Sequence, residues 1–208
     1  MESLIKSLRR SRGAQFGLSA LAVLLALAAV GLLGYPVYTN FYQGRVQDRL
    51  SRQIASPEHI QRYKSGALKD GDALTRIKIP AIGVDVVVVE GTSASALRAG
   101  AGHYPKTPLP CEAGNVGIAG HRTTYGKPFA NIDRLKSGDA IILETPVGSC
   151  TYEVNEKGPF VTTPTDFSVV ANDPGTHALT LTSCHPKGSA KERIVVKASL
   201  TKSATTKA

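Results

Sequence analysis

Three side chains suited to acyl-transfer chemistry lie where predicted β-strands begin or end. Cys184 ends the apolar run of residues 178–184, and Arg193 opens the next apolar run nine residues later. His121 ends an upstream, glycine-flanked run, residues 116–121. Because strand backbones are stiff, their ends can hold three side chains in one small volume. A thiolate nucleophile, a proton partner and a cation that faces an oxyanion are the components of covalent acyl transfer.

Cys184 also has a plainer interpretation, since a lone cysteine that ends an apolar strand is most often a small buried hydrophobic residue. Two features favour a reactive thiol instead. An unpaired cysteine is a liability in an exported protein unless it is protected or used. Arg193, across the predicted hairpin, would favour the thiolate form of Cys184.

The chain has three cysteines, so one is left over after a single pairing. Cys111 and Cys150 are the natural pair, and we predict a disulfide between them. In the chain-entropy model, a bridge that closes a loop of about 40 residues contributes about 3–4 kcal/mol to stability. The alternative is a pair of free, half-buried thiols at these two positions.

His121 is the most suitable of the five histidines, because its ring can project into a cleft from the end of a strand. His185 adjoins Cys184 but points to the opposite side of an extended backbone. The remaining three are assigned to a polar segment, an irregular crossing and a surface turn: His59, His103 and His177. The cysteines are scattered and no Cys-x-x-Cys or His-x-x-x-His spacing occurs, so no metal and no cofactor are expected.

The net charge of +9 is unevenly distributed along the 208 residues. Residues 1–15 carry four basic and one acidic side chain, and residues 41–70 carry six basic and three acidic ones. Residues 71–208 are nearly balanced, with fifteen basic and twelve acidic side chains. The excess therefore flanks an apolar run and favours a membrane surface. Nucleic-acid binding is not expected, because the sequence has no basic helix with interleaved aromatic residues and no zinc-finger spacing.

Residues 16–38 are uncharged, rich in Leu, Ala and Val, and long enough to cross a bilayer as a helix. Because basic residues precede this span, we predict a single-pass protein of the cell membrane with a cytoplasmic N-terminus and an extracellular remainder. The tyrosines at the end of the span suit the membrane interface. A cleaved secretory signal is the alternative, although its apolar region would be shorter.

The composition divides the chain into five parts. We expect a cytoplasmic basic segment at residues 1–15, a transmembrane helix at 16–38, and a polar, partly helical extracellular tether at 39–72. A catalytic β-domain follows at 73–201, and a disordered tail at 202–208. The β-domain has runs of alternating or β-branched residues separated by Gly and Pro turns. This pattern predicts a mainly β fold, a closed barrel of seven to eight strands with short helices.

The predicted strands are residues 74–79, 84–89, 116–121, 139–144, 150–161, 178–184 and 193–200. Between them, residues 92–98 have the small and capping residues of a short helix. Residues 100–110, rich in Gly and Pro, are expected to form an irregular crossing. Residues 128–135 are expected to form one or two helical turns.

The sequence Thr-Leu-Thr-Ser-Cys at residues 180–184, with Arg193 on the next strand and Gly120-His121-Arg122 upstream, closely resembles the sortases. These are cysteine transpeptidases that attach surface proteins to the Gram-positive cell wall or link pilins. The resemblance covers roughly residues 74–200 and implies a sortase-type β-barrel. Ser183 stands where the family usually has Thr. The His-Pro after Cys184 and the sequence of residues 119–126 are similar to class E, the housekeeping-type sortases of actinobacteria, with class D as the nearest rival.

The resemblance implies a role for each of the three residues. Cys184 would attack the Thr–Gly carbonyl of a Leu-Ala-x-Thr-Gly or Leu-Pro-x-Thr-Gly sorting signal. His121 would exchange protons with the departing and incoming amines, and Arg193 would stabilise the oxyanion. The expected partners are secreted proteins with a C-terminal sorting signal and an amine of a peptidoglycan precursor or a pilin.

The resemblance also implies substrate contacts at Thr182 and Ser183. Tyr104 and Tyr125 flank the motifs and are expected to line the signal-peptide groove; the alternative is that each is a rim tyrosine with no role. Some sortases bind calcium through acidic loop residues. Asp166 and Asp173 lie in a comparable loop of this sequence, but two scattered carboxylates are too few, so no metal is predicted.

Two other functions stay open. One is an extracellular cysteine peptidase or an L,D-transpeptidase that acts on peptidoglycan, although the Ser-His-Gly-Cys signature of the latter is absent. The other is a non-catalytic, membrane-anchored domain that binds the wall or partner proteins, with Cys184 buried and silent.

Overall fold

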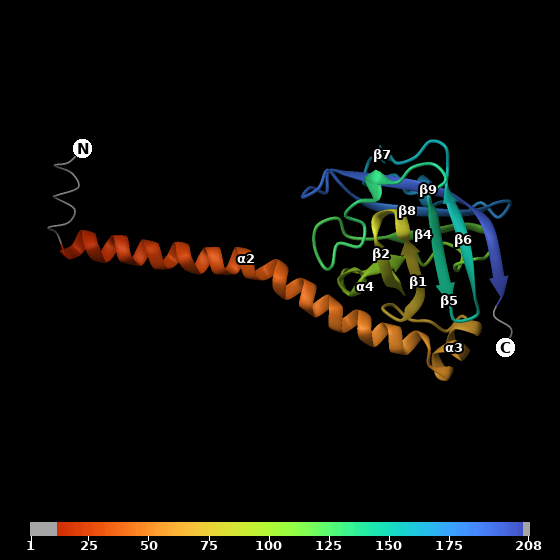
Figure 1. Ribbon diagram of the computed structural model, residues 1–208, viewed down its shortest axis with the longest axis horizontal. Coiled ribbons are helices and arrows are strands. Elements are labelled where there is room, and N and C mark those ends of the chain that lie inside the picture. Colours follow the sequence, from red (N-terminus) through yellow and green to blue (C-terminus); the bar gives the residue numbers. More distant parts are fainter. Residues whose placement is uncertain (1–11, 206–208) are drawn as a thin grey trace. The chain divides into compact units, whose positions relative to one another are not determined.

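Eight strands close into a barrel in the computed structural model, which describes residues 12–205 (Figure 1). A ninth, short strand pairs outside the ring. In chain order the strands are β1 (Ala73–Ile79), β2 (Val84–Glu90), β3 (Ala101–His103), β4 (Gly114–Ala119), β5 (Ala140–Thr145), β6 (Gly148–Val154), β7 (Phe160–Thr162), β8 (His177–His185) and β9 (Glu192–Thr205).

The ring follows the order β6-β5-β1-β2-β3-β4-β8-β9 and closes where β9 pairs with β6. The pairs β2–β3 and β4–β8 are parallel, and the other strand pairs are antiparallel. The short strand β7 is hydrogen-bonded to β9. The closed, mainly β barrel predicted from the strand pattern is confirmed.

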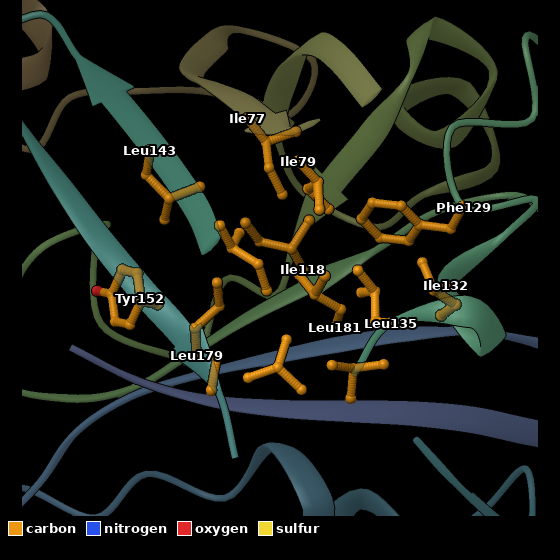
Figure 2. Close-up of a cluster of buried hydrophobic side chains, with 14 of the residues drawn as sticks. Ile77, Ile79, Ile118, Phe129, Ile132, Leu135, Leu143, Tyr152, Leu179 and Leu181 are labelled. Carbon is orange, nitrogen blue, oxygen red and sulfur yellow. The ribbon is translucent and has the colours of Figure 1, made fainter. Parts of the chain in front are cut away.

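The barrel is filled by alternate side chains of its strands. Val116 and Ile118 of β4, Leu179 and Leu181 of β8, and Ile194 and Val196 of β9 belong to one buried cluster. Figure 2 shows Ile118, Leu181 and Phe129 pointing toward one another in this core. Because side chains alternate along a strand, the intervening residues of β4, β8 and β9 lie on the outer face of the barrel.

Short helical elements connect the strands. They are α3 (Pro57–Lys64), α4 (Ala94–Ala99), and the 3-10 turns η1 (Pro80–Ile82), η2 (Ile132–Arg134) and η3 (Phe167–Val170). Ser93 caps α4 by accepting a hydrogen bond from the Ala96 N–H, so the predicted short helix at residues 92–98 is present.

Two strand predictions are wrong in detail. The expected irregular crossing at residues 100–110 contains β3, a three-residue, glycine-containing strand that is too short to show a periodicity. The single strand predicted at residues 150–161 is two strands, β6 and β7. A turn separates them, in which the Gly158 N–H donates to the Asn155 carbonyl and Gly158 has a left-handed φ of 60°.

The chain divides into two compact units, residues 1–39 and residues 40–208. The first unit is described from Arg12 onward and is the N-terminal part of helix α2 (Arg12–Ile54). Within residues 12–205, α2 is long and apolar enough to cross a membrane, with a mean hydropathy of 2.5 in its most apolar stretch. Most of the predicted basic segment, residues 1–11, lies outside the described residues.

The segment predicted as a tether is folded against the barrel within the second unit. Val46 and Leu50 of α2 are buried against Val87 and Val89 of β2 and against α4. The buried Tyr63 of α3 contacts Thr145, and burial raises the pKa of the Tyr63 hydroxyl to about 12. The prediction of a tether without packing was therefore wrong for residues 40–64. The few apolar residues of this segment share one helix face, which is sufficient because the barrel supplies the rest of that interface.

Side-chain amides and an imidazole reinforce this packing. Gln47 donates to the carbonyls of Val87 and Ala99 at 3.1 and 2.8 Å, and its own carbonyl accepts from the Val87 N–H at 2.7 Å. His59 of α3 is fully buried, with Nε2 2.6 Å from the Ala73 carbonyl. The helices are thus tied to β1 and β2 by hydrogen bonds as well as by apolar contact.

The predicted disulfide between Cys111 and Cys150 is confirmed, with an S–S distance of 2.09 Å. The predicted tail at residues 202–208 is partly wrong, because β9 continues to Thr205 by pairing with β6 as far as Gly148. The edge of β6 requires a partner to close the barrel, which explains the longer strand. Residues 206–208 lie outside the described residues.

Candidate active site

Cys184 and Arg193 lie directly opposite each other near the open ends of β8 and β9. Directly opposed side chains of an antiparallel pair point to the same face, with Cβ atoms about 5 Å apart. Leu181 of β8 and Ile194 of β9 face the core, so both Cys184 and Arg193 belong to the outer face. Cys184 is half-buried and is the free cysteine among the three, so its thiol is not sealed in the interior.

His121 follows β4, the strand on the other side of β8. In the parallel β4–β8 pair, Ala119 is opposite Thr182, and the Gly120 N–H donates to the Thr182 carbonyl at 3.0 Å. His121 comes two residues after Ala119, as Cys184 comes two residues after Thr182, so both follow the same end of the β4–β8 pair. The structure therefore brings all three residues to the same end of β4, β8 and β9.

The Arg193 guanidinium lies against the turn that joins β8 to β9. Its Nη1 donates to the carbonyls of Ala190 and Glu192 at 3.1 and 3.0 Å. These contacts hold the guanidinium at the same strand ends as Cys184. Its other N–H groups can donate to a ligand oxygen.

His121 is half-buried beside an aromatic ring. The rings of His121 and Tyr125 are 5.5 Å apart between centroids, and the Phe129 N–H donates to the His121 carbonyl at 3.1 Å. Burial lowers the pKa of the His121 imidazole below its ordinary value of 6.5, since it disfavours the charged ring. At neutral pH the ring is therefore mainly uncharged.

Thr182 and Tyr104 meet on the outer face, two residues before Cys184. The Tyr104 hydroxyl and the Thr182 Oγ1 are 2.9 Å apart, and Thr182 is almost fully buried under the tyrosine. Tyr104 is fixed in turn by its own N–H, which donates to the Gly117 carbonyl of β4 at 3.0 Å. Both residues of the predicted substrate-binding set thus lie next to the thiol-bearing strand end.

Ser183 is a correction to that set. It alternates with Cys184 along β8, is 4% exposed, and donates from Oγ to the Gly120 carbonyl at 2.6 Å. Its hydroxyl therefore ties β8 to the residue that precedes His121, and it does not face a ligand on the outer side. Tyr125 lies beside the His121 ring, as described above, and not along β8.

A groove of about 650 Å³ begins at Tyr104. It is lined by Thr92, Tyr104, Pro105, Lys106, Thr107, Phe167, Val170, Ala171 and Asn172. Phe167, at the end of the groove formed by η3, leaves 67% of its side chain exposed. An apolar groove with a few hydroxyl and amide groups suits an extended peptide, and its residue Tyr104 is hydrogen-bonded to Thr182 of β8.

Arg122 is a residue of the site that the sequence reasoning missed. It is 4% exposed, its Nε donates to the Ala130 carbonyl at 3.2 Å, and its Nη2 is 3.1 Å from Asp133. Its Nη1 lies 3.5 Å from the Cys184 carbonyl. A buried arginine that joins the main chain at Cys184 to the loop after His121 couples the two predicted catalytic residues. The sequence feature that could have pointed to Arg122 is its position directly after His121. That position does not indicate that the arginine is buried.

Asp166 is engaged by its own turn. Its carboxylate accepts hydrogen bonds from the Thr162 hydroxyl at 2.6 Å and from the N–H and hydroxyl of Ser168. These bonds hold the pKa of Asp166 below its usual range. In the part of the chain that the structure describes, no three His, Cys, Asp or Glu side chains are grouped to hold a metal ion.

Comparisons with known proteins agree on one family. A family model described as "Sortase domain" matches residues 77–201. Sortase SrtE1 of Streptomyces coelicolor is 36% identical over 146 residues, which cover 63% of this chain but only 41% of that protein. A solved sortase D5 transpeptidase of Clostridium perfringens has a TM-score of 0.67 and 34% identity, with 77% of this chain and 98% of that chain covered.

Sortase E of Streptomyces avermitilis, also a solved structure, has a TM-score of 0.60 and 34% identity. The similarity covers 66% of this chain and 93% of that chain. The predicted likeness to class E is confirmed by these matches, and a sortase D structure is similar as well.

Proposed function

This chain belongs to the sortase family of cysteine transpeptidases, and we propose that it cleaves a C-terminal sorting signal between Thr and Gly and transfers the protein to an amine. The observation that carries this proposal is the common register of β4, β8 and β9. It supports a thiol, an imidazole and a guanidinium acting at one end of the outer face, beside a peptide-sized groove.

The reaction proceeds in two acyl transfers. The Cys184 thiol gives its proton to the neutral His121 imidazole, the sulfur attacks the threonine carbonyl carbon, a C–S bond forms, and the carbonyl oxygen becomes an oxyanion near the Arg193 guanidinium. The C–N bond to glycine then breaks, and His121 supplies the proton that the departing amine takes. The product is a thioester between Cys184 and the threonine.

The second transfer reverses these roles. An amine attacks the thioester carbonyl and gives its proton to His121, the C–S bond breaks to release the Cys184 thiolate, and the thiolate takes that proton back from His121. The amine belongs to a peptidoglycan precursor or to a pilin. His121 gives one proton to the departing amine and takes one proton from the incoming amine. The enzyme therefore returns to its starting state after a full cycle.

The groove supplies the recognition. Tyr104 lines the groove and is held to β8 by its hydrogen bond to Thr182, and the exposed Phe167 offers an apolar contact to a leucine-like side chain. A sorting signal of the Leu-Ala-x-Thr-Gly or Leu-Pro-x-Thr-Gly type would lie extended in this groove, with its threonine toward the thiol.

The N-terminal part of α2 anchors the enzyme in the membrane. Its apolar stretch and the basic residues that precede it favour a cytoplasmic N-terminus and an extracellular barrel. A disulfide between Cys111 and Cys150 fits an oxidising compartment on that side.

A peptide assay tests the proposal directly. The full chain in detergent micelles is incubated with a quenched fluorescent Leu-Ala-x-Thr-Gly peptide, with and without an amine acceptor, and the products are identified by mass spectrometry. A Thr–amine adduct supports a transpeptidase. Hydrolysis at a rate indifferent to the amine indicates a peptidase, and an unchanged peptide indicates a non-catalytic domain, so either result contradicts the proposal.

Replacing Arg193 with lysine should lower kcat/KM by about 10²-fold, because an ammonium does not reproduce the planar fork of a guanidinium. The measurement is steady-state cleavage of the same peptide, with thermal unfolding to show that the variant folds. Lys187→Ala, in the same turn between β8 and β9, controls for an unspecific effect of changing a basic side chain there, since Lys187 is exposed and donates to Asn131. Near-native turnover of Arg193→Lys would remove Arg193 from the active site.

The pH profile should show the effect of burial on His121. The kcat/KM of a Cys–His pair is bell-shaped, with its acid limb set by the lower of the two pKa values. Because burial lowers the pKa of His121, activity should persist as pH falls and decline only below pH 6.5. Tyr125→Ala should expose the ring and move the acid limb up toward 6.5. An acid limb above 6.5 in the unmodified enzyme would argue against His121 as the titrating group.

A further inference from the structure

The loop after His121 contains a strained turn. Tyr125, Gly126 and Lys127 have φ angles of 49°, 70° and 42°, three left-handed residues in succession. A non-glycine residue is strained in this conformation, because its Cβ comes too close to the following carbonyl oxygen. Such strain persists only where the surroundings over-determine the backbone, and it is concentrated at functional sites. The contacts that hold this turn therefore matter for the residues that the loop carries.

Gln43 of α2 lies directly against the middle of this turn. A Cβ added at Gly126 would overlap the Cδ, Oε1 and Nε2 atoms of the Gln43 carboxamide. Gln43 is only 7% exposed, so the contact is a buried one. The side chain fills the space over the Gly126 α-carbon and blocks the turn from moving toward the helix.

The Gln43 amide is also unusual in its hydrogen bonding. Among the described residues, its Nε2 is buried without a hydrogen-bond partner. Leaving a buried amide group unpaired is destabilising, so a polar side chain is an unfavourable way to fill this space. Its position at the strained turn points to a role in placing the loop and not to a role in stabilising the helix.

The turn is connected to His121 through aromatic contacts. The Tyr125 ring lies 5.5 Å from the His121 ring between centroids, and the Arg98 guanidinium of α4 lies over the Tyr125 ring, 6.0 Å from its centroid. Helix α4 is held in turn by α2, because Gln47 donates to the Ala99 carbonyl. Residues 43–47 of α2 thus support both the turn and the helix that carries Arg98.

We propose that Gln43 is a positioning residue of the active site, which fixes the turn at residues 125–127 and thereby the orientation of the Tyr125 and His121 rings. The proposal rests on the function proposed above for His121. The part of α2 that follows the membrane span then contributes to catalysis by positioning these rings.

The test compares three variants of the full chain in detergent micelles, assayed with the Leu-Ala-x-Thr-Gly peptide and an amine. Gln43→Ala should lower kcat by about tenfold with KM nearly unchanged, since misplacing a catalytic group by a fraction of an ångström reduces rate and not peptide binding. Gln43→Met, which refills the volume without the amide, should recover kcat to within about threefold of the unmodified enzyme.

Gln53→Ala is the matched control on the same helix. Gln53 bonds to Asp72 and to the Ala73 N–H, away from the His121 loop. It should lower the unfolding temperature as much as Gln43→Ala or more, and leave kcat unchanged. If kcat falls in both Gln43→Ala and Gln53→Ala in proportion to the loss of unfolding temperature, the role of Gln43 is structural only and the proposal is overturned.

A coupling experiment tests the contact itself. Gly126→Ala should lower kcat, because the new methyl group overlaps the Gln43 carboxamide and alanine disfavours the left-handed φ. In the double variant Gln43→Ala with Gly126→Ala, the overlap is removed and only the φ strain stays. Its kcat should therefore exceed the product of the two single effects by at least about threefold. Purely multiplicative effects would overturn the proposal.

The outcomes separate this inference from the proposed function. If the unmodified chain makes no amine adduct, the proposed function fails. If the unmodified chain is active and Gln43→Ala is equally active, or Gln43→Met is as slow as Gln43→Ala, only the positioning role fails.

Discussion

Replacing Cys184 with alanine should abolish both cleavage and transfer, lowering kcat/KM by more than about 10⁴-fold to the uncatalysed background. The thiol forms the covalent bond through which both half-reactions pass, so no other group can compensate for it. Cys184 is half-buried at the end of β8, and its truncation removes a single sulfur, so the barrel should still fold. The measurement is the peptide assay, with mass spectrometry of the protein to detect the thioester adduct.

Thiol labelling supplies the control for this variant. Iodoacetamide should modify the non-reduced, unmodified protein once, at Cys184, and should stop turnover as it does so, because the other two cysteines are bridged. The Cys184→Ala protein should take up no label. Residual turnover in Cys184→Ala, or full activity after labelling, would mean that the nucleophile lies elsewhere.

Replacing His121 with alanine should lower kcat/KM by about 10³-fold, the usual loss when a general acid and base is removed. Because the same imidazole serves the leaving amine and the incoming amine, both acylation and transfer should slow. Single-turnover measurements separate the two steps: rapid mixing with peptide reports thioester formation, and addition of the amine to the trapped thioester reports transfer.

His177→Ala is the matched control for His121→Ala, since His177 is exposed at the opposite end of β8 from Cys184. It should retain the rate of the unmodified enzyme. Thioester formation at the normal rate in His121→Ala would assign the proton donor to another group.

The barrel and the positions of the three site residues were predictable because the strong signals are local. The apolar alternation of β8 and β9 places Cys184 and Arg193 opposite each other once a hairpin is assumed. The odd cysteine count predicted the bridge between Cys111 and Cys150. Motif spacing placed His121 at the end of a strand. The parallel pairing of β4 with β8 puts that end beside the end of β8 that carries Cys184.

The missed features depend on contacts between distant segments. Gln43 and Arg122 are polar residues that become buried only because α2 and the His121 loop fold against other elements. Ser183 faces inward because side chains alternate along a strand, which puts it on the opposite side from Cys184. The family motif gives the residue types and not the face on which each side chain lies. The packing of residues 40–64 was missed for a related reason, since the barrel supplies most of the apolar surface that this segment needs.

The closing strand has a consequence for how the protein is made. Strand β9 pairs with β6, β7 and β8, and it is the last of the barrel strands in the chain. Until residues 192–205 are added to the growing chain, β6 and β8 each lack a partner on one side, and the barrel is an open sheet. The ring would seal, and Arg193 would meet Cys184, only after the final segment emerged. A chain that lacks β9 would therefore hold the Cys184 thiol without the Arg193 guanidinium, and we expect it to be inactive.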